Sequence, residues 1–328
     1  MFGKESVVTV DGYGFSGGLA AARPRALAPL RTLRALLRSW SESGTHFSAQ
    51  LGTARSLASS QPAPAELFTA AVIGDLLLGL TGTEELTLRI NAMLLDGLRR
   101  SPLLALFKDR RPQPADVGFT ALAYSLLLRA QQPVAKQANQ ALDLTLQQVT
   151  SEGLVPAHIG DSRTPRHMDL VACTQVLYLA RLLGRADEVR RTESYVRCYF
   201  LNEHYQQGTR YHLTAETFLY FLGRLVCHFP NTYVSLRQHL GQAVLARIGT
   251  SRHPIDLAQR IILARWLGLS DYTERAQLQR LQQSDGTWPA DSMLLIQPDA
   301  QTGSDPLLLG SAALSTAFAY RALTPESV

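Results

Sequence analysis

Four carboxylates stand where apolar helices are predicted to begin. Asp116, Asp169 and Asp256 each come at the start of a mostly apolar run, and Glu216 lies in the first turn of another. If these helices run in parallel, their N-termini meet at one rim, where free N–H groups and partial positive charge attract carboxylates. Such a group of acids could donate a proton, accept one or stabilise a cation. The alternative is that each acid only caps its own helix.

The segment HIGDSRTPRHMD, which leads into the helix after Asp169, is the richest in polar side chains. His167 lies two positions before Asp169 and could pair with it for proton transfer. Arg163 and Arg166 could hold a phosphate or a carboxylate of a substrate. His212, in the segment RYHLTAE, takes the corresponding place before another apolar helix. A solvated loop with local salt bridges explains the same residues without any chemistry.

Three tyrosines lie within the predicted apolar helices, namely Tyr124, Tyr178 and Tyr220. Their rings could line a pocket and stabilise an apolar ligand or a carbocation through π contacts. Aromatic residues at helical spacing are also ordinary core residues. Both interpretations stay open at this point.

Cysteine and histidine do not form a recognisable metal-binding pattern. Cys173, Cys227 and the adjacent His228 are the candidates, and their spacing fits no zinc motif. We therefore expect buried thiols, with no metal and no other cofactor. Three cysteines without a CxxC pair also favour a reducing compartment.

The composition predicts a soluble cytoplasmic protein with a substantial core. The chain has 328 residues, of which 46% are hydrophobic and 18% charged. No apolar run approaches the ~18 to 20 residues that span a bilayer. The net charge of +5 comes from scattered arginines, and no nucleic-acid motif is present. Arg31, Arg34 and Arg38 share one helical face, which is either simply solvated or in peripheral contact with a membrane.

Helical periodicity dominates the chain, and strand-like runs are nearly absent outside SVVTV near the start. Six helices with charged outer faces are predicted at 25–40, 85–99, 134–149, 186–200, 234–247 and 271–283. Six more apolar helices alternate with them, at 66–80, 116–129, 169–183, 214–227, 256–267 and 311–323. Helices that are apolar on nearly all sides must be buried. The pattern predicts an all-α fold, an (α/α)6 toroid of six inner and six outer helices. Residues 25–328 form this single domain, residues 1–24 an N-terminal extension, and residues 41–64 a loop.

The stretch LQRLQQSDGTWPAD predicts a specific turn after the last charged helix. Gln282, Asp285, Gly286 and Trp288 follow the order Q-x-x-D-G-x-W, and LQQVTSEGLVPAH repeats the pattern in degraded form. Glycine permits a sharp reversal, an aspartate can accept backbone N–H groups, and tryptophan can cover the junction. We interpret the motif as a structural clasp between helices, not as a reactive site.

An alternation of helices with such turns resembles the squalene-hopene cyclase and prenyltransferase superfamily. PADVGFTALAYSLL resembles the family segment that carries the acid motif D-x-D-D, and GSAALSTAFAYRAL resembles a closing inner helix. The resemblance implies a toroid whose central cavity binds an apolar substrate. The chain departs from the motif, because Asp116 is followed by Val117, Gly118 and Phe119 and only the first acid remains.

We therefore expect a small biosynthetic enzyme that binds an isoprenoid or polyene in the cavity and cyclises or isomerises it by acid–base chemistry. Asp169 and Asp116 are the first candidates for managing protons. The alternative is a non-catalytic toroid, either a lipid- or peptide-binding module or a partner subunit. A carbohydrate-active toroid ranks last, because such a cleft needs exposed tryptophans and the chain has three in all.

Overall fold

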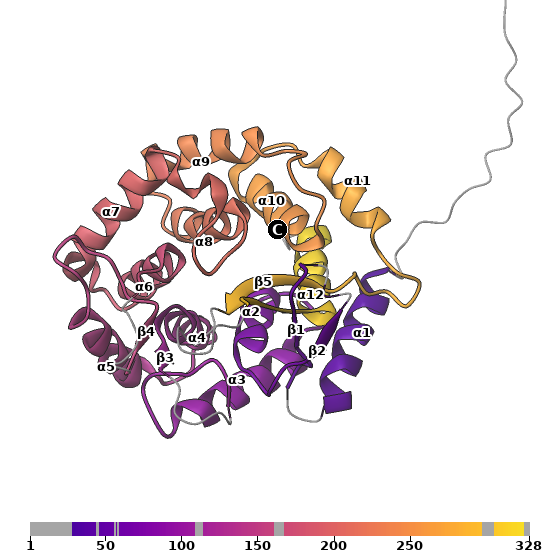
Figure 1. The fold of residues 1–328 in the computed structure, drawn as a ribbon, viewed down its shortest axis with the longest axis horizontal. Coiled ribbons are helices and arrows are strands. Elements are labelled where there is room, and N and C mark those ends of the chain that lie inside the picture. Colours follow the sequence, from indigo (N-terminus) through magenta and orange to yellow (C-terminus); the bar gives the residue numbers. More distant parts are fainter. Residues whose placement is uncertain are drawn as a thin grey trace, which may run out of the picture.

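The helices of the chain form two concentric rings. The computed structural model describes residues 28–43, 46–55, 57, 59–108, 114–160, 167–296 and 305–324. Within them, inner and outer helices alternate along the chain (Figure 1). The inner helices are α2 (Phe68–Leu77), α4 (Val117–Arg129), α6 (Leu170–Leu182), α8 (Ala215–His228), α10 (Pro254–Leu267) and α12 (Ala312–Leu323). The outer helices are α1 (Ala28–Ser43), α3 (Glu84–Leu98), α5 (Ala135–Leu146), α7 (Arg190–Leu201), α9 (Val234–Ala246) and α11 (Tyr272–Arg280).

The inner ring is closed. Each inner helix packs on the next one in the chain, and α12 packs on both α10 and α2. All ten residues of α2 are buried, as are the first eleven of α10, which agrees with the mostly apolar sequences of these helices. The twelve predicted helices are all present, each within a few residues of its expected bounds.

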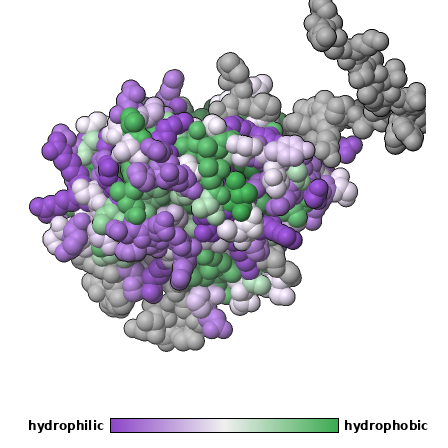
Figure 2. Space-filling model, turned by 90° about the horizontal axis from the view of Figure 1, so that it is seen from above, coloured by the Kyte–Doolittle hydropathy of each residue, from purple (hydrophilic) through white to green (hydrophobic). Residues whose placement is uncertain are grey.

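The outer helices bury one face and expose the other. In α3, for example, Leu86, Ile90 and Leu94 are buried, whereas Leu88 between them is largely exposed. The side of the molecule seen in Figure 2 is covered mainly by hydrophilic residues, with apolar residues between them. In the part of the chain that the structure describes, no helix is both long and apolar enough to cross a membrane.

Short strands, which the sequence analysis did not predict, lie in the connections that lead into the inner helices. β1 (Gln50–Gly52) pairs with β2 (Ser60–Pro62) and with β6 (Leu307–Ser311), which pairs with β5 (Asp291–Ile296). β3 (Ala115–Asp116) pairs with β4 (His158–Ile159). The predicted loop or flexible connection at 41–64 therefore contains two of these short strands, β1 and β2. The shortest strands have too few residues to show an alternation of apolar and polar side chains. The longer strands β5 and β6 carry apolar residues on both faces, so they show no alternation either. The segment SVVTV lies outside the described residues.

The turn after α11 is a structural clasp between helices, as the sequence predicts, and the structure shows that it lies against α1. Gly286 has a φ of 92°, and a Cβ there would lie 3.1 Å from the Cβ of Arg31. Asp285 accepts a hydrogen bond from the backbone N–H of Thr287 at 2.9 Å. The buried indole of Trp288 donates to the carbonyl of Leu278 at 2.8 Å. The motif is thus a clasp that closes the ring of outer helices.

Candidate functional site

Asp116 and Asp169 cap two neighbouring inner helices. Oδ1 of Asp116 accepts the N–H of Phe119 at 2.7 Å, at the start of α4. The two oxygens of Asp169 accept the N–H groups of Val171 and Ala172 at 3.1 and 3.2 Å, at the start of α6. Both side chains are held by the free N–H groups of a helix end, which also favour their negative charge. The capping interpretation is therefore correct for both acids, and it fixes their positions side by side.

Gly118 explains why α4 and α6 approach so closely. A Cβ at this position would lie 3.2 Å from the Cβ of Ala172, so a larger residue would have to push the neighbouring helix away slightly. Gly118 stands where the resemblance would place an acid. The close approach puts Asp169, at the start of α6, near enough to act electrostatically on Asp116.

The carboxyl group of Asp116 has a strongly perturbed environment. Burial raises the pKa of Asp116 above its ordinary value, and the nearby charge of Asp169 raises it further. His158 and the N–H of Phe119 act in the opposite direction. Nε2 of His158 lies 3.9 Å from Oδ2 of Asp116, and the imidazole is 38% exposed. Asp116 is therefore a carboxyl group with a raised pKa that lies beside a half-exposed imidazole.

Two residues of the segment before α8 complete this group. Nδ1 of His212 lies 2.8 Å from the carbonyl oxygen of Met293, so that nitrogen carries the proton and Nε2 is an acceptor in the neutral ring. His212 is buried and interacts electrostatically with Asp116. Tyr211 packs edge-on against the ring of His158, with 5.6 Å between centroids. We call Asp116, Asp169, His158, His212 and Tyr211 the acid cluster.

His167 lies beside this cluster without joining it. Its backbone carbonyl accepts the N–H of Ala157 at 2.8 Å, and the predicted pairing of its imidazole with Asp169 is absent among the described contacts. Burial lowers the pKa of His167, and the charges of Arg210 and His158 lower it further. Arg163 and Arg166, predicted to bind a substrate anion, lie outside the described residues.

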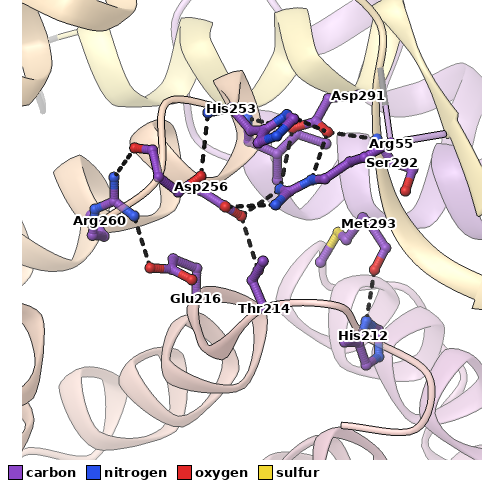
Figure 3. Close-up of polar contacts among 12 residues, drawn as sticks. Arg55, His212, Thr214, Glu216, His253, Asp256, Arg260, Asp291, Ser292 and Met293 are labelled. Atoms are coloured by element: carbon purple, nitrogen blue, oxygen red, sulfur yellow. Dashed lines mark hydrogen bonds and ion pairs between the residues drawn. The ribbon is translucent and has the colours of Figure 1, made fainter. Parts of the chain in front are cut away.

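Glu216 does not face the acid cluster. Its oxygens accept two hydrogen bonds from the guanidinium of Arg247, at 2.7 and 3.0 Å. A further hydrogen bond comes from Arg260 at 2.8 Å (Figure 3). The side chain is fully buried. Arg260 also contacts Glu274, so these four residues form an ion-pair network between inner and outer helices. A buried carboxylate held by two guanidinium groups is a structural anchor between helices.

Asp256 is engaged in a similar way. Nη1 and Nη2 of Arg55 donate to its two oxygens at 2.7 and 2.5 Å, and the hydroxyl of Thr214 donates at 3.0 Å (Figure 3). Nε of Arg55 reaches the buried Asp291 at 2.9 Å. Burial raises the pKa of Asp256, but the hydrogen bond from Arg55 and its charge outweigh it, so the net pKa is lowered. We call Arg55, Asp256 and Asp291 the Arg55 latch, since they tie the segment after β1 to α10 and β5.

The three tyrosines occupy different environments. The hydroxyl of Tyr124 donates to the carbonyl of Pro102 at 2.9 Å, which directs it to the connection between α3 and α4. Tyr220 packs among Phe221, Trp266 and Phe318. Tyr178 lies beneath the guanidinium of Arg224, which is 3.9 Å from the ring centroid. The thiol of Cys173 is buried and accepts the N–H of Val155, and burial raises its pKa to about 12.

Glu66 is a candidate that the sequence analysis missed. It precedes α2 as Asp116 precedes α4, and its Oε2 accepts the N–H of Thr69 at 2.8 Å. The side chain is buried, and Oε1 has no hydrogen-bond partner. Burial raises the pKa of Glu66 to about 7. The available signal was its position, an acid directly before an apolar helix.

Comparisons with known proteins agree with the sequence resemblance. No family model matches the chain. It is 30% identical over 217 residues to the drimenol cyclase drtB of Aspergillus calidoustus, which covers 66% of this chain. The match spans only 39% of that relative, so the chain corresponds to about two-fifths of its length.

Solved structures share the fold over nearly the whole chain. A protein from Actinoplanes superposes with a TM-score of 0.65 at 17% identity, covering 91% of this chain and 98% of that one. The type II terpene cyclase MstE from Scytonema superposes with a TM-score of 0.62 at 13% identity, covering 92% and 98%. A variant of MstE was solved with its substrate, geranylgeranyl dihydroxybenzoate. The resemblance is confirmed: the chain is a relative of terpenoid cyclases in sequence and shares their fold.

Proposed function

We propose that residues 25–328 form a single (α/α)6 toroid that cyclises an isoprenoid or polyene chain in its interior. The observation that carries this proposal is the raised pKa of Asp116, a capping carboxyl that is held beside a second carboxylate. A carboxyl group whose pKa is raised inside a mostly apolar ring is suited to donate the proton that starts cyclisation. The relation to a drimenol cyclase supports the same reaction class.

Two carboxyl groups in unlike surroundings take different roles. Asp116, whose pKa is raised, serves as the proton donor, whereas Asp169 accepts two backbone N–H groups at the start of α6. Asp116 transfers its proton to one carbon of a terminal double bond, and the π electrons form the new C–H bond. The cation left on the other carbon is stabilised by the negative charge of Asp169.

Ring closure then needs no further reagent. The next double bond attacks the cation and forms a C–C bond, and the final cation loses one proton to a general base. The reaction is an isomerisation, because the proton gained equals the proton lost. His158, which is 38% exposed and 3.9 Å from Asp116, returns a proton from solvent to the acid.

The test is product analysis by mass spectrometry after incubation with linear isoprenoid alcohols, isoprenoid diphosphates and squalene. We expect a cyclic isomer of one of them, absent when Asp116→Asn replaces the wild type. Binding without any product, in wild type and variant alike, would favour a non-catalytic lipid-binding toroid.

A further inference from the structure

A second polar cluster lies inside the ring, away from the acid cluster. Nη2 of Arg224, in α8, lies 2.7 Å from Oδ1 of Asp75, in α2. These helices occupy opposite places in the inner ring, three positions apart (Figure 1). Both side chains are 5% exposed. The ion pair therefore crosses the interior of the ring and joins its two sides.

The cluster carries more positive than negative charge. Nη1 of Arg129 contacts the same Oδ1 of Asp75 at 2.7 Å, so two guanidinium groups share one carboxylate. Nη1 of Arg224 donates to the neutral amide of Gln175 at 3.1 Å. Arg129 ends α4, where the helix dipole favours a cation, but this does not account for Arg224. A buried guanidinium without a full counter-charge is costly unless an anion joins it.

Two hydrogen-bond donors of this cluster are unused. The hydroxyl of Tyr178 and the Nε of Arg224 are buried and have no partner among the described residues. The guanidinium lies over the ring of Tyr178, at 3.9 Å, so both donors belong to one small region. Each buried donor without a partner costs about 1–3 kcal/mol. An oxyanion is the group that would satisfy both donors and the excess positive charge together.

The distance between this polar cluster and the acid cluster suits a linear substrate whose two ends differ chemically. Tyr178 follows Asp169 by nine residues of α6, which at ~1.5 Å per residue places it about 14 Å along the ring axis. We propose that Arg224 and Tyr178 bind an anionic head group, a carboxylate or a phosphate, of the apolar substrate. The far end of the chain then reaches Asp116. That the ligand is an isoprenoid or polyene rests on the proposed function, but the binding of its anionic head group by Arg224 and Tyr178 does not.

The experiment measures binding in a protein that cannot turn over. Asp116→Asn is titrated by calorimetry with farnesyl diphosphate, farnesoic acid and farnesol, which share one chain and differ in the head. We expect at least one anionic ligand to bind about tenfold or more tightly than the alcohol, since a charge-assisted bond is worth about 1.5–3 kcal/mol. The tighter of the two anions identifies the head as a carboxylate or a phosphate.

Variants then assign the preference to its residues. In the same background, Tyr178→Phe and Arg224→Lys should each reduce the preference for the anion about tenfold. Tyr233→Phe is the matched control, because Tyr233, at the start of the outer helix α9, pairs with Arg181 in the last turn of α6 and not with Arg224, so the preference should not change. Thermal unfolding confirms that each variant is folded.

Equal affinity for the acid, the diphosphate and the alcohol would overturn the proposal. So would a preference that survives in Tyr178→Phe and Arg224→Lys. Anion preference without any product from the wild type would support the subsite while the cyclase proposal fails. Product formation without anion preference would support the cyclase proposal and overturn the anion-binding subsite.

Discussion

Asp116 and His158 face each other across the short ladder between β3 and β4. Their backbones are register partners, and Nε2 of the imidazole lies 3.9 Å from Oδ2 of the carboxyl. The ladder therefore holds the imidazole of His158 beside the carboxyl of Asp116, which α4 fixes from its other side. In the proposed cyclisation, His158 is the group that reprotonates the acid after each turnover.

Replacing Asp116 by asparagine should lower kcat at least ~100-fold, because the variant has no acidic proton to transfer. Asparagine still caps α4, so the melting temperature should change little. Product formation is measured by mass spectrometry. Asp143→Asn, at a 54% exposed carboxylate on α5, is the control and should retain full activity. A comparable loss of kcat in both variants would show that Asp116 is not the acid that starts the reaction.

The pH dependence of kcat should report the ionisation of Asp116. Its folded pKa is raised, so the active, protonated form persists above the ordinary range of aspartate and is lost as pH rises through the folded value. Asp169→Asn keeps a cap on α6 but removes a like charge. The alkaline fall in kcat should therefore move to lower pH in this variant. If the alkaline fall in kcat occurs at the same pH in the wild type and in Asp169→Asn, the two carboxyl groups are not electrostatically coupled.

Glu66 should make the protein less stable at high pH. Its folded pKa is about 7, above the ordinary value of 4.5, so the folded state binds this proton more tightly than the unfolded state. The free energy of unfolding then falls between these two pH values, by on the order of 3 kcal/mol. Urea unfolding at about pH 5 and about pH 8 measures it.

Glu66→Gln is the matched variant for this effect. It keeps an oxygen for the N–H of Thr69 and removes the ionisation. The variant should be more stable than the wild type at about pH 8 and similar to it at about pH 5. An identical pH dependence in both proteins would mean that Glu66 is not the group responsible.

The Arg55 latch should contribute strongly to stability. Arg55→Met leaves Asp256 and Asp291 buried without their shared cation, which should cost about 3–5 kcal/mol. Adding Asp291→Asn to the Arg55→Met protein removes one of the two buried negative charges and should recover part of the lost stability. Arg89→Met, at an exposed pair with Glu85, should cost at most about 1 kcal/mol. Chemical unfolding compares the four proteins, and a small effect of Arg55→Met would contradict the latch.

The helices were predictable because burial leaves a direct mark on sequence. An inner helix such as α2 is apolar over most of its surface, and a capping acid before α4 or α6 marks where the helix begins. The partners of Glu216 and Asp256 were not predictable. Arg247 and Arg55 lie far from them in the chain, so only the fold shows that these carboxylates are neutralised.

The acid cluster was predictable in part for the same reason. Asp116 and Asp169 could be named from their positions, whereas the ladder that brings His158 to Asp116 is only two residues long and shows no alternation. Gly118 looked like the loss of an acid. Its role in admitting α6 appears only when the two helices are seen packed together.

The most direct test of the account is whether Asp116 initiates cyclisation. Purified wild type and Asp116→Asn are incubated with farnesyl and geranylgeranyl substrates in deuterated water, and the products are analysed by mass spectrometry. The account predicts a cyclic product from the wild type that carries one deuterium from the acid, and none from the variant. A cyclic product without deuterium, or one that Asp116→Asn still forms, would contradict it.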